Sequence, residues 1–298
     1  SMQTLEGLRR NIKSAEDLLS VVKTMKALAA VSIRQYERSV TALADYHQTI
    51  TLGLQAVLQA RRADLRLLAD QDVVSSTRVG AIVFGSDQGL CGQFNERIVE
   101  HTVNVLNGMH VHHHDRVLVA VGARCAGLLV DAGQPLQQPL PTPAGIAGIT
   151  FTVQELLFTV EQWQKEGIDR VYLFHHQPRS GWRYHPLTVP LLPIDLRYLQ
   201  DCRQAPWVSR SLPTFTMSWR RLFALLLREA LFIALFRACA SSLASEEASR
   251  LMAMQNAERN ITERLDELHT RYHYQRQTTI TAELLDLVGG YEAVTRRA

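Results

Sequence analysis

No glycine lies between Gly181 and Gly289, and no proline follows Pro213. In a helix interior, glycine costs about 1 kcal/mol relative to alanine and proline costs about 3 kcal/mol. Their absence permits one continuous helix over residues 218–294, which would be roughly 110 Å long. A globular domain of this size cannot enclose such a helix. We therefore expect the helix to extend from the body and to pack on a second long helix.

Other absences exclude several classes of protein. The formal net charge of +3 over 298 residues is too small to indicate nucleic-acid binding by itself. The most apolar run, residues 222–236, is too short to span a bilayer and contains Arg228 and Glu229. The N-terminus lacks the continuous apolar core of a signal peptide. The few cysteines lack metal-binding spacing and predict reduced thiols in the cytosol; they are Cys91, Cys125, Cys202 and Cys239.

Apolar side chains recur in alternating steps of three and four residues in both terminal segments, which is typical of a coiled coil. In the first segment the series includes Leu5, Leu8, Ile12, Ala15, Leu19 and Val22, and it continues after a slip to Met25, Ala29, Ser32 and Tyr36. In the second it includes Leu251, Met254, Ala257, Ile261, Leu265, Leu268, Tyr272, Gln275, Thr279 and Ala282. We predict coiled-coil helices over residues 1–60 and 218–294. Two separate amphipathic helices on one globular core are the alternative, which their length disfavours.

The middle of the chain alternates between strand and helix patterns. Strands are predicted at residues 78–84, 116–121, 169–174 and 183–192, the last at a sheet edge, and helices at residues 93–106, 124–131 and 151–166, with Thr152 as a helix N-cap. Residues 59–76, 133–150 and 193–217 are interpreted as connections. The prediction is a Rossmann-like α/β domain over residues 77–195 with a mostly parallel sheet, so the fold class is α/β with a long antiparallel coiled coil.

No pattern in the chain indicates catalysis, a cofactor or a metal. The glycine-rich residues 85–92 lie between a strand and a helix, but they lack the GxGxxG and P-loop patterns, so a tight turn is favoured over a phosphate site. A histidine cluster is interpreted as a solvated loop: His110, His112, His113 and His114. His175 and His176 are expected to end a strand, and Asp87, Asp195 and Asp201 are isolated carboxylates.

Three motifs in order give the chain a resemblance to a known family. Residues 12–26 read IKSAEDLLSVVKTMK, residues 86–95 read SDQGLCGQFN, and residues 243–254 and 272–283 read LASEEASRLMAM and YHYQRQTTITAE. Together they resemble the gamma subunit of F-type ATP synthases over essentially the whole chain.

The resemblance implies a central rotor stalk without catalytic residues. It implies a helical shaft inside a hexamer of alpha and beta subunits, and a foot on the epsilon subunit and the membrane c ring. It places the protein peripherally at the cytoplasmic face of the bacterial plasma membrane. It also implies that eight positions couple the shaft to alpha and beta: Lys23, Met25, Lys26, Asp87, Arg250, Gln277, Thr281 and Glu283.

The sequence departs from the family pattern at several positions. Gln88 replaces an arginine of the family, and His273 and Tyr274 follow Tyr272 in place of the usual asparagine. These departures are similar to the divergent N-ATPase branch, often associated with sodium transport. Two rivals from other classes are a stand-alone coiled-coil adaptor, which needs no hexameric partner, and a small-molecule enzyme, which would bind nucleotide through residues 85–92. Sparse charge pairing beside the seam and the missing phosphate-binding pattern disfavour them.

Overall fold

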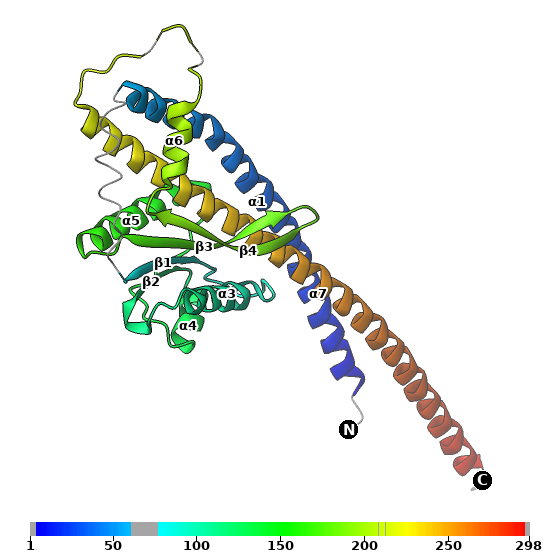
Figure 1. Ribbon diagram of the computed structural model, residues 1–298. Helices are drawn as coiled ribbons and strands as arrows, with labels where there is room; N and C mark the ends of the chain where they lie inside the picture. Colours follow the sequence, from blue (N-terminus) through cyan, green and yellow to red (C-terminus); the bar gives the residue numbers. More distant parts are fainter. Residues whose placement is uncertain (1–3, 61–76, 208, 212, 296–298) are drawn as a thin grey trace. The chain divides into compact units, whose positions relative to one another are not determined.

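The computed structural model describes residues 4–60, 77–207, 209–211 and 213–295. The chain divides into two compact units. We call residues 1–28 and 251–298 the helical unit, and residues 29–250 the α/β unit. Two long helices, α1 (Leu5–Ala60) and α7 (Trp219–Thr295), contribute residues to both units (Figure 1).

A four-stranded sheet forms the centre of the α/β unit, in the order β2-β1-β3-β4. Its strands are β1 (Val79–Phe84), β2 (Arg116–Val121), β3 (Arg170–Arg179) and β4 (Arg183–Leu192). β1 pairs in parallel with β2 and β3, whereas β3 and β4 form an antiparallel hairpin. The prediction of a mostly parallel sheet with residues 183–192 at its edge is therefore confirmed.

Helices cover both faces of this sheet because its strands are apolar on both sides. Ala81 and Val83 of β1 pack with α3 (Phe94–Gly108) and α4 (Ala123–Asp131) on one face. Ile82 and Phe84 pack on the other face with α5 (Ile146–Lys165) and with a buried stretch of α7 that includes Leu235 and Cys239 (Figure 1). The end of β1 and the loop that follows it thus lie between α3 and α7.

A further core in the α/β unit joins the second half of α1 to α7. It includes Ile50 and Leu54 of α1, Leu199 of α6 (Leu196–Gln204), and Phe223 and Ile233 of α7. In the helical unit the same two helices pack through the predicted seam, where Leu8 and Ile12 contact Leu265 and Leu268. The fold class is confirmed: the chain has long N- and C-terminal helices that pack together, and an α/β domain with a mixed four-stranded sheet. No helix among the described residues has the length and apolarity needed to cross a membrane.

Three boundary predictions are wrong. Helix α5 begins at Ile146 rather than at residue 151, because Gly145 adopts a positive φ of 98° directly before it. Thr152 is therefore inside the helix, where its hydroxyl bonds back to the carbonyl of Gly148. β3 continues to Arg179, so His175 and His176 lie within the strand and are buried.

The region predicted as a connection at residues 193–217 contains helix α6. The Asp195 carboxylate caps this helix by accepting a hydrogen bond from the backbone N–H of Arg197. Most of the predicted connection at residues 59–76 lies outside the described residues.

Candidate functional site

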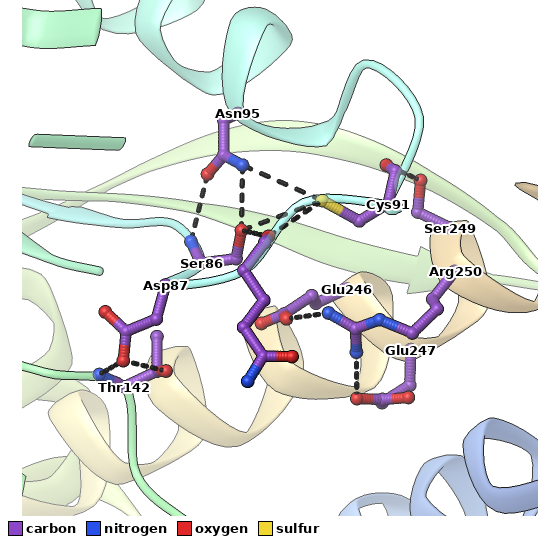
Figure 2. Close-up of polar contacts among 10 residues, drawn as sticks. Ser86, Asp87, Cys91, Asn95, Thr142, Glu246, Glu247, Ser249 and Arg250 are labelled. Carbon is purple, nitrogen blue, oxygen red and sulfur yellow. Dashed lines mark hydrogen bonds and ion pairs between the residues drawn. The ribbon is translucent and has the colours of Figure 1, made fainter. Parts of the chain in front are cut away.

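The loop of residues 85–92 is folded onto the start of α3 by the side chain of Asn95 (Figure 2). The Asn95 amide oxygen accepts the backbone N–H of Ser86 at 2.9 Å, and the amide nitrogen donates to the Ser86 hydroxyl at 2.8 Å. The Ser86 hydroxyl in turn donates to the carbonyl of Gln88 at 2.8 Å. These groups are satisfied within the chain, which agrees with a tight turn.

Asp87 ties this loop to two other segments of the α/β unit. Its carboxylate accepts the backbone N–H of Ala123 at 2.7 Å, and the backbone N–H and hydroxyl of Thr142 at 2.8 and 2.6 Å. Burial raises the pKa of the Asp87 carboxyl, but the three hydrogen bonds outweigh burial and hold the pKa below its ordinary value. Asp87 is therefore an ionised structural anchor rather than an isolated carboxylate.

Arg250 on α7 is buried between two carboxylates of its own helix (Figure 2). It donates to Glu246 at 2.5 Å and also forms an ion pair with Glu247. Burial raises the pKa of Glu246 to about 7 despite the attraction of Arg250, and burial also raises the pKa of Glu247. The Arg250 guanidinium thus neutralises the charges of two carboxylates that are largely shielded from solvent. Removing it would leave both carboxylates without this counter-ion.

The structure brings Asp87 and Arg250 to one open cavity of about 360 Å³. Its walls come from α1, the loop after β1, residues 142–145 and α7: Tyr36, Asp87, Gln88, Thr142, Pro143, Ala144, Gly145, Leu243, Glu246, Glu247 and Arg250. Burial raises the pKa of the Tyr36 hydroxyl to about 12, with a further contribution from Glu247 and Glu246. Sequence reasoning missed Tyr36 and the two glutamates, although the Glu246–Arg250 spacing of four residues was a usable signal.

The other predicted coupling residues lie in the helical unit. Lys26 of α1 forms an ion pair with Glu258 of α7, and its hydrogen bond lowers the pKa of that half-buried carboxyl. Met25 is half-buried beside the seam, whereas Lys23 is exposed. The Lys26–Glu258 pair therefore fixes the pairing of the two helices at their surface, where salt will screen it.

The last predicted positions lie on α7 where the seam ends. Gln277, Thr281 and Glu283 are all exposed, and the Thr281 hydroxyl donates to the carbonyl of Gln277. A shallow depression here is lined by Tyr274, Gln277, Thr278, Thr281, Ala282 and Leu285. Exposed apolar side chains continue along the helix: Ile280, Leu284, Leu285, Leu287, Val288 and Tyr291. An apolar helix surface of this kind is typical of a segment that a protein partner covers.

The remaining candidates are the cysteines and the clustered histidines. All four cysteines are buried and free. Within the described part of the chain, no group of three or more histidine, cysteine or carboxylate side chains is placed to hold a metal ion. Of the clustered histidines, His112 and His114 stack on each other in an exposed segment, as predicted for a solvated loop.

Comparison with known proteins gives consistent matches over nearly the full chain. The family model described as ATP synthase matches residues 4–294. The chain is 27% identical over 292 residues to the ATP synthase gamma chain of Brevibacillus brevis, covering 97% of this chain and 98% of that protein. It is 28% identical over 324 residues to the ATP synthase gamma chain of Nostoc punctiforme, covering 99% of this chain and 100% of the relative.

Solved structures show the same fold in larger assemblies. A chain of the Euglena gracilis mitochondrial ATP synthase OSCP/F1/c-ring structure matches with a TM-score of 0.62 and 17% identity, covering 97% of this chain and 94% of that one. A chain of the Tetrahymena thermophila mitochondrial ATP synthase central stalk and c-ring matches with a TM-score of 0.54 and 20% identity, covering 80% and 99%.

Proposed function

The chain belongs to the ATP synthase gamma chain family, and from this premise we propose how it contacts its partners. It is the central-stalk subunit of an F-type ATP synthase and has no catalytic role of its own. The alpha and beta subunits surround part of the antiparallel helices, and epsilon and the c ring bind the α/β foot. The chain itself lies peripherally at the cytoplasmic face of a bacterial plasma membrane, and the bacterial source of the relatives supports this placement.

The observation that carries this proposal is the exposed apolar end of α7. Leu284, Leu285 and Leu287 are 56%, 67% and 70% exposed, and the charged residues beside them on α7 are Glu283 and Asp286. A largely apolar surface can turn against a protein sleeve without strong, angle-specific contacts. We further propose that Lys23, Met25, Lys26, Gln277, Thr281 and Glu283 supply the few polar and flexible contacts that couple shaft angle to the beta subunits.

Reconstitution with the alpha and beta subunits of the same source tests this proposal. We expect one copy of the chain to assemble with three of each and to support ATP hydrolysis. Gln277→Ala should lower the coupled rate roughly two- to tenfold, because one hydrogen bond of about 0.5–1.5 kcal/mol is lost. Gln255→Ala, at an exposed position of the same helix, is the matched control and should leave the rate unchanged. A chain that binds neither subunit yet is stable alone would support the adaptor alternative.

We propose separately that the chain belongs to the divergent N-ATPase branch. The supporting observations are Gln88 in place of the family's arginine and His273-Tyr274 after Tyr272. Since the c ring selects the ion, the test needs the complete holoenzyme. We expect sodium to stimulate its ATP hydrolysis at constant pH and ionic strength, with potassium as the control. Equal rates in sodium and potassium would contradict this assignment and would leave the rotor function unaffected.

A further inference from the structure

A hydrogen-bonded chain crosses from the β3–β4 hairpin through α7 to the 85–92 loop. The Tyr184 hydroxyl of β4 lies 2.9 Å from the Ser249 hydroxyl of α7, which lies 2.5 Å from the carbonyl oxygen of Cys91. A carbonyl only accepts, so the Ser249 hydroxyl donates its proton to Cys91. The Tyr184 hydroxyl must then donate to Ser249. The bond from Tyr184 thus fixes the rotamer of Ser249, and the bond from Ser249 to Cys91 fixes the loop.

The Tyr184 ring is itself held in place by its neighbours. It makes edge-on contacts with Phe94 and His176, at centroid distances of 5.7 and 4.8 Å, and the Arg97 guanidinium lies 5.8 Å from its centroid. His176 also bonds through Nε2 to the carbonyl of Phe94 at 2.8 Å. Since Phe94, the first residue of α3, is separated from the loop by Gln93 alone, the same cluster fixes both Tyr184 and the loop's end.

Most of the buried α7 side chains at this contact are small. They are Ala240, Ser241, Ser242, Ala244, Ser245, Ala248 and Ser249, with Leu243, Glu246 and Arg250 as the larger buried residues of the same stretch. Small side chains allow a close approach but offer few large projections that would interlock with the sheet. Hydrogen bonds, which are directional, therefore add to the apolar packing of Leu235 and Leu243 in setting how α7 is registered against the α/β body.

We propose that Tyr184 is a positioning residue of the rotor. Through Ser249 it holds the 85–92 loop at one register on α7, so that torque passes between the α/β body and this helix without slip. Ser249 directly precedes Arg250, and the loop carries Asp87, so the same contact sets the geometry of the cavity that these two residues line. The inference rests on the rotor function and not on the proposed beta contacts.

The test uses the assembled, membrane-bound holoenzyme with Tyr184→Phe and Ser249→Ala, each alone and together. Tyr184→Phe keeps the ring contacts and removes only the hydroxyl. Tyr172→Phe is the matched control, because the hydroxyl of this β3 tyrosine accepts a hydrogen bond from Arg170 of the same strand. The readout is the ratio of ATP-driven ion pumping to ATP hydrolysis, measured per assembled complex.

We expect each single variant to keep its hydrolysis rate and to lose at least half of its pumping ratio. The double variant should be no worse than Ser249→Ala, because both substitutions break one chain of bonds. A pumping ratio equal to that of Tyr172→Phe would overturn the inference. So would variants that yield less assembled complex but keep the normal pumping ratio in each complex. Failure of the unmodified complex to couple pumping to hydrolysis would instead overturn the rotor function.

Discussion

Replacing Arg250 by glutamine is expected to lower the free energy of unfolding by about 3–5 kcal/mol at pH 8, the usual cost of removing one partner of a buried ion pair. Glu246 and Glu247 would keep their buried positions without the cation that compensates them. Urea unfolding of the purified chain measures the effect. The same variant should assemble poorly with alpha and beta, because Arg250 and Asp87 line one cavity and the displaced glutamates would distort it.

The loss should depend on pH in a defined direction. The folded-state pKa of Glu246 is about 7, above its ordinary value of 4.5, so the folded chain binds more protons in this window and its stability falls as pH rises through it. Without Arg250 this pKa rises further, so the difference between variant and parent should widen from pH 6 to pH 8. A second change, Glu246→Gln, should recover part of the lost stability in the Arg250→Gln background.

Arg264→Gln supplies the matched control on the same helix. Arg264 also pairs with a glutamate of its own helix, Glu267, but both side chains are more than half exposed. Its loss should cost less than about 0.5–1 kcal/mol, as exposed pairs do. Equal losses from the two arginine variants, or a loss at Arg250 that does not change with pH, would contradict the assignment of burial as the cause.

The sequence was most informative where structure depends on local periodicity. Leu8, Ile12 and Val22 are buried as the three/four spacing requires, and on α7 the seam residues from Leu251 to Thr279 are buried or half-buried. Spacing of this kind shows which face of a helix is apolar, and that face is the one that packs against a neighbouring helix. After the slip at Met25 the predicted series is less accurate. Ile33, which is not in the series, is buried, whereas the predicted Ser32 is only half-buried.

The sequence was less informative where position depends on contacts distant in the chain. The start of α5 depends on a glycine in a positive-φ conformation, and helix α6 is stabilised by an aspartate cap and by packing on α1 and α7. Asp87 and Arg250 were chosen through resemblance alone. Their shared cavity, and the contribution of Tyr36 from α1, result from the way three separate segments cover the end of β1, which no local pattern encodes.

The loop that carries Asp87 also lies in close backbone contact with Gly122, the residue that follows β2. Gly122 has a φ of +114°, and a Cβ built on it would lie 2.7 Å from the backbone N, C and O atoms of Ser86. Its own N–H donates to the carbonyl of Leu140 at 2.8 Å, so the residue cannot easily move away. The next residue, Ala123, donates its N–H to Asp87.

Gly122→Ala should therefore lower the free energy of unfolding by roughly 4 kcal/mol, since it combines an unfavourable φ with a backbone collision that no rotamer change relieves. Gly127→Ala is the control: it lies in the interior of α4 with open space around its Cα, and helix propensity predicts a gain of up to about 1 kcal/mol. Urea unfolding of both variants gives the comparison. If Gly122→Ala unfolds at the urea concentration of the parent chain, the loop and the end of β2 are not in the close contact described above. If it unfolds as expected, it should also assemble poorly with alpha and beta, as Arg250→Gln should, because displacement of Ser86 carries Asp87 with it.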